Sequence, residues 1–152
     1  EQLKSLDKQI KKRNLIANLY LNGLKDYYLK YDILKKPDFK FQTYPLKQNS
    51  KKNNQSIHAF YRLNLFINKN KVKQNKLIQQ LIKNKINCGV GSCPEIYREK
   101  VFKKLKLYPK KRLPNAKLLG ETSIMFPINP NKSEREVKSE INLIKKIFNR
   151  YV

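Results

Sequence analysis

The sequence predicts an α+β fold in which a small antiparallel or mixed sheet of about three strands is covered by helices. Apolar residues recur at helical spacing near both ends of the chain, and residues 58–68 alternate with the period of a strand. No repeat at a fixed period is visible, and 152 residues fit one domain with a thin core.

The first half of the chain contains one expected helix and two expected strands. Residues 1–29 should be helical, with a weak point or bend at Gly23 and the apolar residues Leu3, Leu6, Ile10, Ile16, Leu19 and Tyr20 on one face. A short strand is expected over residues 39–45, followed by the polar loop of residues 47–56. The clearest strand covers residues 58–68, with Ala59, Tyr61, Leu63 and Leu65 on one side and His58, Phe60, Arg62, Asn64 and Phe66 on the other.

The second half alternates short helices with one more strand. Residues 71–86 should form a helix with Val72, Leu77, Leu81 and Ile82 on its apolar face, and a second helix should run from Pro94 or Glu95 to Leu105. A helix ended by Gly120 and a short or edge strand at residues 124–128, interrupted by Pro127, are expected next. The last helix has a capping box at Ser133 and Glu136 and an apolar stripe of Val137, Ile141, Ile144 and Ile147.

The formal net charge of +24 is the most unusual feature of the composition. Such a charge favours a nucleic-acid partner, because clustered cations release counterions from phosphates. Only six of the 35 basic residues are arginine, however, and nucleic-acid readers favour the arginine fork. The accompanying Asn and Ile are typical of an AT-rich coding sequence, so specific nucleic-acid binding is the less favoured interpretation.

Residues 86–102, "INCGVGSCPEIYREKVF", contain both cysteines of the chain. A zinc site needs four ligands, and neither a second cysteine pair nor a histidine pair accompanies Cys88 and Cys93. The spacing is not that of a redox Cys-x-x-Cys, and the two glycines do not match a phosphate loop. Ser92 and Glu95 have capping-box spacing, and Pro94 suits a first helical turn. The segment is best interpreted as a turn into a capped helix, which leaves open whether it also lines a pocket.

Targeting signals and catalytic groups are sparse. No apolar run approaches the roughly 18 residues that cross a bilayer, and the first residues lack a signal peptide, so a cytoplasmic protein with reduced thiols and no membrane partner is expected. His58 is the single histidine, and a lone histidine at a strand end is usually a surface residue. Arg62, inside an otherwise apolar strand, must face solvent or meet an anion. Arg62 and Tyr61 should point to opposite sides of that strand.

Four segments in order, "LDKQIKKRNLIANLY", "HAFYRLNLFI", "CPEIYREKVF" and "RLPNAKLLGETSIMFPINPNKSEREV", resemble the C-terminal third of DegT-type sugar aminotransferases. The resemblance implies the small domain of an aspartate-aminotransferase-like, fold type I enzyme. Enzymes of this family use pyridoxal 5'-phosphate to transfer an amino group, usually from glutamate, to a keto group on a nucleotide-linked sugar. They act in polysaccharide synthesis.

The resemblance also implies that two domains of the enzyme have different roles. The cofactor would be held by a large domain that precedes this region, which fits a chain that starts at Glu1 and has Met125 as its single methionine. Residues 1–30 would be a helix that links to that domain, and residues 31–152 would be the small domain of a homodimer. No catalytic, cofactor-binding or metal-binding residue can be assigned here, so the chain alone should be inactive. The expected substrate-binding residues are His58, Tyr61, Arg62, Cys88, Ser92, Cys93, Glu95 and Tyr97.

Three functions therefore stay open from the sequence. The first is the small domain of a nucleotide-sugar aminotransferase. The second is a basic nucleic-acid-binding domain, because Tyr and Phe are interleaved with Lys in residues 27–44. The third is a small domain used on its own as an interaction module.

Overall fold

The computed structural model describes residues 2–35, 58–91 and 93–152. In chain order the elements are η1 (Gln2–Ser5), α1 (Leu6–Gly23), α2 (Lys25–Leu29), β1 (Leu34–Lys35), β2 (Arg62–Ile67), α3 (Gln74–Lys83), β3 (Gly89–Val90), η2 (Ile96–Arg98), α4 (Lys100–Lys104), α5 (Pro114–Thr122), β4 (Ser123–Pro127), α6 (Glu134–Phe148) and η3 (Asn149–Tyr151). The strand expected at residues 39–45, the loop at 47–56 and Ser92 lie outside the described residues.

The sheet confirms the α+β class and is antiparallel; among the described residues it has four strands in the order β1-β2-β4-β3. The sequence predicted neither β1 nor β3, because a strand of two residues is too short to give a periodic signal. Residues 124–128 were expected to form a short or edge strand; β4 is short, with five residues, but it lies between β2 and β3 and not at the edge. Pro127 is tolerated there because it is the last residue of β4, and the ladder resumes where Ile128 N donates to Tyr61 O at 3.3 Å.

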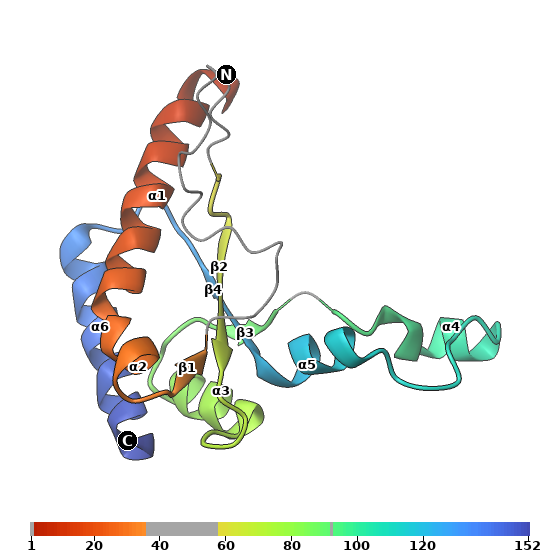
Figure 1. Ribbon diagram of the computed structural model, residues 1–152. Helices are drawn as coiled ribbons and strands as arrows, with labels where there is room; N and C mark the ends of the chain where they lie inside the picture. The colour runs from red at the N-terminus through yellow and green to blue at the C-terminus, as the bar shows by residue number, and fades with distance from the viewer. Residues whose placement is uncertain (1, 36–57, 92) are drawn as a thin grey trace, which may run out of the picture.

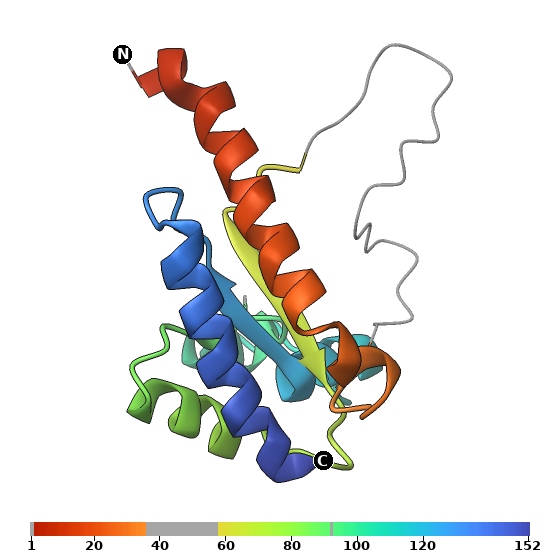
Figure 2. The ribbon, with the colours of Figure 1, turned by 90° about the vertical axis from the view of Figure 1, so that its left-hand side faces the viewer.

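Helices α1 and α6 pack against each other and cover one face of the sheet (Figure 1, Figure 2). The register of β2 and β4 places Leu63 opposite Phe126 and Leu65 opposite Ile124 on this covered face. The apolar side chains that meet between the two layers include Ile16, Ala17, Tyr20, Leu63, Leu65, Ile124, Phe126, Val137, Ile141, Ile144 and Phe148, all buried. The sheet together with α1, α3 and α6 is called the body below.

The helix expected over residues 1–29 is interrupted after Gly23, the weak point expected from the sequence, where α1 approaches α6 closely. A Cβ at position 23 would lie 2.7 Å from Cγ2 of Ile141 on α6. The absence of a side chain there lets the two helices meet. Beyond this point α2 continues the contact, since the Tyr27 hydroxyl lies 3.1 Å from Lys145 O and its ring meets Phe148 edge-on at 5.1 Å.

The last helix matches its prediction closely. The Ser133 hydroxyl accepts from Glu136 N at 3.3 Å, and the Glu136 carboxylate accepts from Ser133 N at 2.7 Å, which completes the capping box. The four residues of the predicted stripe are all buried. In α3 the prediction holds for Leu77 and Leu81, but Ile82 is exposed and Ile78 is buried in its place.

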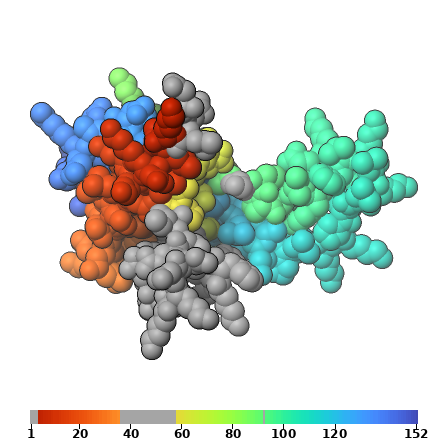
Figure 3. Space-filling model, turned by 90° about the horizontal axis from the view of Figure 1, so that it is seen from above, coloured from red at the N-terminus to blue at the C-terminus, as the bar shows by residue number. Residues whose placement is uncertain are grey.

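Residues 93–113, called the arm below, project away from the body (Figure 1, Figure 3). The single helix expected from Pro94 to Leu105 is wrong, because the backbone becomes extended at Glu99, with ψ 150°, between η2 and α4. α5 leads back to the sheet; it starts with Pro114 in its first turn and runs through Gly120 to Thr122. The large apolar side chains exposed along the arm are Ile96, Val101, Leu105, Leu107, Tyr108 and Leu113.

Candidate functional site

The residues predicted to bind substrate fall into two groups. His58, Tyr61 and Arg62 lie just before β2 and at its first residue, whereas Cys88, Cys93, Glu95 and Tyr97 follow one another from β3 into the arm. Ser92 is not among the described residues. The two groups have different surroundings.

Tyr61 and Arg62 do not point to opposite sides, contrary to the alternation expected along residues 58–68. β2 begins only at Arg62, and Phe60 has a positive φ of 43°, so the strand period does not extend back to Tyr61. Arg62 Cζ lies 5.4 Å from the centroid of the Tyr61 ring, and the ring is 66% exposed. Both side chains therefore face solvent together, and neither enters the core.

A residue that the sequence did not single out joins them. Arg13, on α1, places its Cζ 6.0 Å from the same Tyr61 ring. The contact is possible because Asn14 Nδ2 donates to His58 O at 2.8 Å and fixes the start of β2 against α1. Within α1, Arg13 looks like one more cation on a solvated helix face, so helical periodicity alone could not reveal it.

His58 supports the backbone at this point. Its Nδ1 accepts from Phe60 N at 3.0 Å, and its ring lies 4.4 Å from the Phe60 ring, centroid to centroid. These contacts stabilise the left-handed backbone of Phe60, a conformation that costs free energy for a residue with a side chain. One imidazole nitrogen is thus already used as an acceptor, and contact of His58 with a substrate stays a prediction.

The two cysteines have different environments, and both are free thiols. Cys88 is half-buried and packs against the core, and burial, with a smaller contribution from Glu140, raises the pKa of its thiol to about 11. A thiol with that pKa is protonated at neutral pH and is a poor nucleophile. Cys93 is exposed, and its Sγ lies 3.7 Å from Glu99 Oε1.

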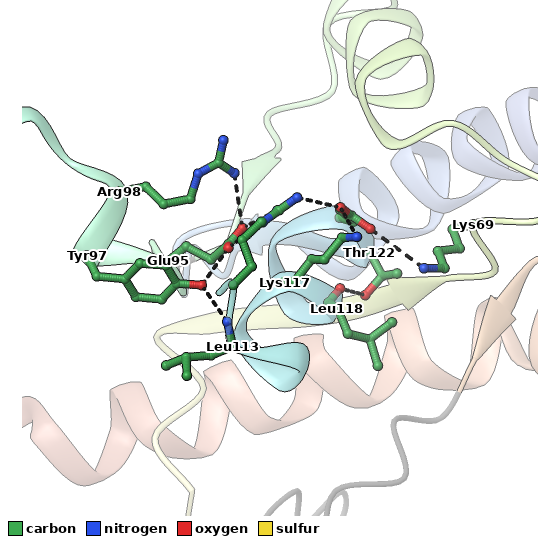
Figure 4. A network of polar contacts seen from close by, with 10 residues as sticks. Lys69, Glu95, Tyr97, Arg98, Leu113, Lys117, Leu118 and Thr122 are labelled. Carbon is green, nitrogen blue, oxygen red and sulfur yellow. Dashed lines mark hydrogen bonds and ion pairs between the residues drawn. The ribbon is translucent and has the colours of Figure 1, made fainter. Parts of the chain in front are cut away.

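Glu95 is the centre of a polar network at the base of the arm (Figure 4). Arg112 grips its carboxylate with two hydrogen bonds, Nε to Oε1 at 2.8 Å and Nη2 to Oε2 at 2.5 Å. The Tyr97 hydroxyl donates to Oε1 at 2.7 Å, and Arg98 Nη1 donates to Oε2 at 3.3 Å. Arg112 is the main cause that lowers the pKa of Glu95 to about 2.

The network closes the arm into a loop. The Tyr97 hydroxyl accepts from Leu113 N at 3.1 Å, and Arg112 Nη1 reaches Glu121 on α5 at 3.3 Å. The two segments on either side of the arm are therefore joined at its base by charge-assisted bonds. The capping box expected at Ser92 and Glu95 involves Ser92, which lies outside the described residues, and the Glu95 carboxylate accepts from Arg112.

The substrate contacts expected of Glu95 and Tyr97 stay predictions, and they would compete with these bonds. Both carboxylate oxygens of Glu95 already accept from cationic or hydroxyl donors. Glu95 is 8% exposed, so little of it faces solvent. The immediate chemical effect of the pair is to fix the path of the arm.

A shallow groove of about 490 Å³ lies apart from both groups. It is lined by Lys8, Gln9, Lys11, Lys12, Leu15, Pro130 and Asn131, between α1 and the loop after β4. Its lysines attract anions in general but give no directional fork for one group. In the ranges that the structure describes, no group of three or more His, Cys, Asp or Glu could hold a metal ion, and no helix could cross a membrane.

The comparisons with known proteins agree on one family. The model of the DegT/DnrJ/EryC1/StrS aminotransferase family matches residues 1–145. The uncharacterized protein MJ1066 of Methanocaldococcus jannaschii is 33% identical over 92 residues, which is 59% of this chain and 24% of that protein.

Two solved structures show how far the similarity in fold extends. An aminotransferase from Psychrobacter cryohalolentis matches 99% of this chain with a TM-score of 0.81 and 28% identity. PseC from Helicobacter pylori, an aminotransferase of pseudoaminic acid biosynthesis, also matches 99%, with a TM-score of 0.74 and 18% identity. The chain spans 37% and 35% of these two proteins, respectively.

Proposed function

Because the chain belongs to the DegT/DnrJ/EryC1/StrS aminotransferase family of sugar-modifying, pyridoxal-phosphate-dependent enzymes, we propose that it is the C-terminal part of such an enzyme. The reaction is the transfer of an amino group, from glutamate, to a nucleotide-linked keto sugar in polysaccharide synthesis. The observation that carries the proposal is the match of 99% of the chain to little more than a third of the Psychrobacter aminotransferase.

The division into domains belongs to the same proposal. Residues 1–30 link to a large domain, and residues 31–152 form the small domain, which packs on the large one and helps to enclose the sugar. The full enzyme is a cytoplasmic homodimer. The division into two domains is supported by the share of the related proteins that the chain spans.

The cofactor is best placed outside this chain. In this proposal none of the lysines of this chain forms the covalent bond to pyridoxal phosphate. The large domain would supply the lysine, and pyridoxal phosphate, when bound there, would supply the electron-withdrawing ring that labilises bonds at the amino carbon.

The residues of this chain would contribute to the sugar pocket from two sides. His58, Tyr61 and Arg62 offer hydrogen-bond donors, an aromatic ring and a cation at the start of β2. The segment from Cys88 to Tyr97, with Ser92 and Cys93, leads into the arm, whose base is fixed by Glu95. In this proposal the body positions the first group and the arm positions the second.

The test uses the full-length protein, expressed from the coding sequence that includes the region upstream of Glu1. Purified enzyme would be mixed with pyridoxal phosphate, glutamate labelled with nitrogen-15, and a panel of nucleotide-linked keto sugars. We expect nitrogen-15 in the sugar by mass spectrometry and an equal amount of 2-oxoglutarate. The 152-residue chain alone should give neither product.

The salt dependence of nucleic-acid binding distinguishes the aminotransferase proposal from the rival function, a nucleic-acid-binding domain. Binding of the chain to DNA and RNA would be measured from low to above-physiological salt. Binding that disappears as salt rises reflects the net charge of +24, whereas sequence-selective binding that persists at physiological salt would contradict the aminotransferase proposal.

A further inference from the structure

Two guanidinium groups face one exposed tyrosine ring at the start of β2. Arg13 comes from α1 and Arg62 is the first residue of β2, and their Cζ atoms lie 6.0 Å and 5.4 Å from the Tyr61 centroid. Arginine over an aromatic face is favourable, but the second cation on the same ring repels the first. The fold therefore gathers positive charge here.

Neither guanidinium meets a carboxylate among residues 2–35, 58–91 and 93–152. The hydrogen bond made by Arg13 runs from Nη2 to Gln9 Oε1 at 3.4 Å, and its Nε is buried without a partner in those ranges. Arg62 contacts the Tyr61 ring and forms no ion pair with the residues that the structure describes. By contrast, Arg98 and Arg112 both bind Glu95. A buried donor without a partner is unfavourable until an acceptor reaches it.

We propose that Arg13, Tyr61 and Arg62 form a subsite for the diphosphate of a nucleotide-linked sugar, a proposal that rests on the proposed function. The planar guanidinium fork matches phosphate oxygens with two parallel hydrogen bonds, which a lysine cannot provide. A diphosphate carries two phosphoryl groups, one for each arginine. The Tyr61 ring lies close to both guanidinium groups, and the residue is largely exposed to solvent.

The geometry distinguishes this subsite from the general positive charge of the molecule. The lysines of the groove by Pro130 also attract anions, but they provide point charges without a fixed fork. The proposed subsite should therefore discriminate between a diphosphate and simple monovalent anions at equal ionic strength. It should also depend on two arginines that α1 and β2 contribute separately.

The experiment compares two double variants of the 152-residue chain with equal charge. The first is Arg13→Gln with Arg62→Gln. The second is Arg135→Gln with Arg150→Gln, which removes two exposed arginines near the ends of α6. Binding of inorganic pyrophosphate and of uridine diphosphate would be measured by calorimetry at fixed physiological ionic strength. Circular dichroism would verify that each variant is folded.

We expect the first variant to bind both probes at least about tenfold more weakly than the unmodified chain, because each lost fork removes charge-assisted hydrogen bonds. The control variant should lose less than about twofold. In the unmodified chain, the Nε–H signals of Arg13 and Arg62 should shift on addition of pyrophosphate. Tyr61→Phe should retain most of the affinity, and Tyr61→Leu should lose it.

Equal losses in the two double variants would overturn the subsite, because the binding would then reflect net charge. No binding to the unmodified chain, or unshifted Arg13 and Arg62 signals, would overturn it as well. The labelled-nitrogen assay on the full-length protein is a separate readout. If the full-length protein transfers the amino group but the probes do not bind at these arginines, the proposed subsite is refuted and the proposed function still holds. If the probes bind but no amino group is transferred, the proposed function is refuted and the arginines form an anion site.

Discussion

The body and the arm use different physical means to hold their shapes. In the body, two helices bury an apolar face against the sheet, and Leu63, Phe126 and Phe148 are almost fully enclosed. In the arm, large apolar side chains such as Leu105 and Leu107 remain exposed, and a buried carboxylate holds the base. The arm therefore has no apolar core of its own, and one charged network at its base fixes its position.

The largest effect should follow from a cavity in the body. Leu63→Ala removes a fully buried side chain and should lower the free energy of unfolding by about 2–5 kcal/mol. The matched change in the arm, Leu107→Ala, alters a residue that is 63% exposed and should cost less than about 0.5 kcal/mol. Urea denaturation monitored by circular dichroism measures both. Similar losses for the two variants would refute the contrast between body and arm.

A smaller effect is expected at the start of α6. Ser133→Ala removes the hydroxyl that accepts from Glu136 N and should destabilise the body by about 1 kcal/mol. Ser139→Ala, on the exposed side of the same helix, serves as the control and should change stability little or slightly increase it, since alanine favours helices. If Ser133→Ala behaves like Ser139→Ala, the capping box does not contribute to stability.

The arm should respond to a change that leaves the body intact. Glu95→Gln removes the charge that Arg112 and Arg98 bind, so the arm base should open more often. Hydrogen exchange at Leu113 N, which donates to the Tyr97 hydroxyl, should accelerate at least about tenfold, with no change at the amides of β2. Glu134→Gln, an exposed glutamate on α6, is the matched control. Unchanged exchange at Leu113 would show that the network does not hold the arm.

The weakest effect is a pH dependence of the same network. The pKa of Glu95 is lowered to about 2, mainly by Arg112, from an ordinary value of about 4.3 in an unfolded chain. The stabilisation is therefore fully present above about pH 4.3 and is lost as pH falls toward 2. Titration of the Glu95 carboxyl carbon by nuclear magnetic resonance measures the pKa. A Glu95 pKa near the ordinary value would contradict the proposed stabilisation of its carboxylate by Arg112.

Part of the structure could be predicted from the sequence because the signals are local. The capping box of Ser133 and Glu136 lies within four residues, and the apolar stripe of α6 repeats along one helix. The alternation of residues 63, 65 and 67 in β2 is of the same kind. Where a break in the backbone interrupts the period, prediction failed: Phe60 and Glu99 mark the places where the expected strand and helix stop short.

The candidate site could be predicted only in part. Arg62 was identified because a charge in an apolar strand is unusual, and Tyr61 was identified through the family resemblance. Arg13 lies among ordinary helix cations and has no local signal. Glu95 was identified for a cap, whereas its partner Arg112 lies 17 residues further along the chain. Contacts between residues so far apart in the sequence depend on the tertiary path of the backbone, and hydrophobic periodicity does not predict that path.

The sequence by itself determined the α+β class, the helix of residues 134–148 with its cap, and the resemblance to sugar aminotransferases, because each depends on the order and spacing of neighbouring residues. The tertiary structure alone decided that β4 lies inside the sheet, that Arg112 grips Glu95, and that Arg13 and Arg62 meet on Tyr61. The physical reason is that burial and ion pairing act between residues that are close in space, and folding brings together residues that are distant in the chain.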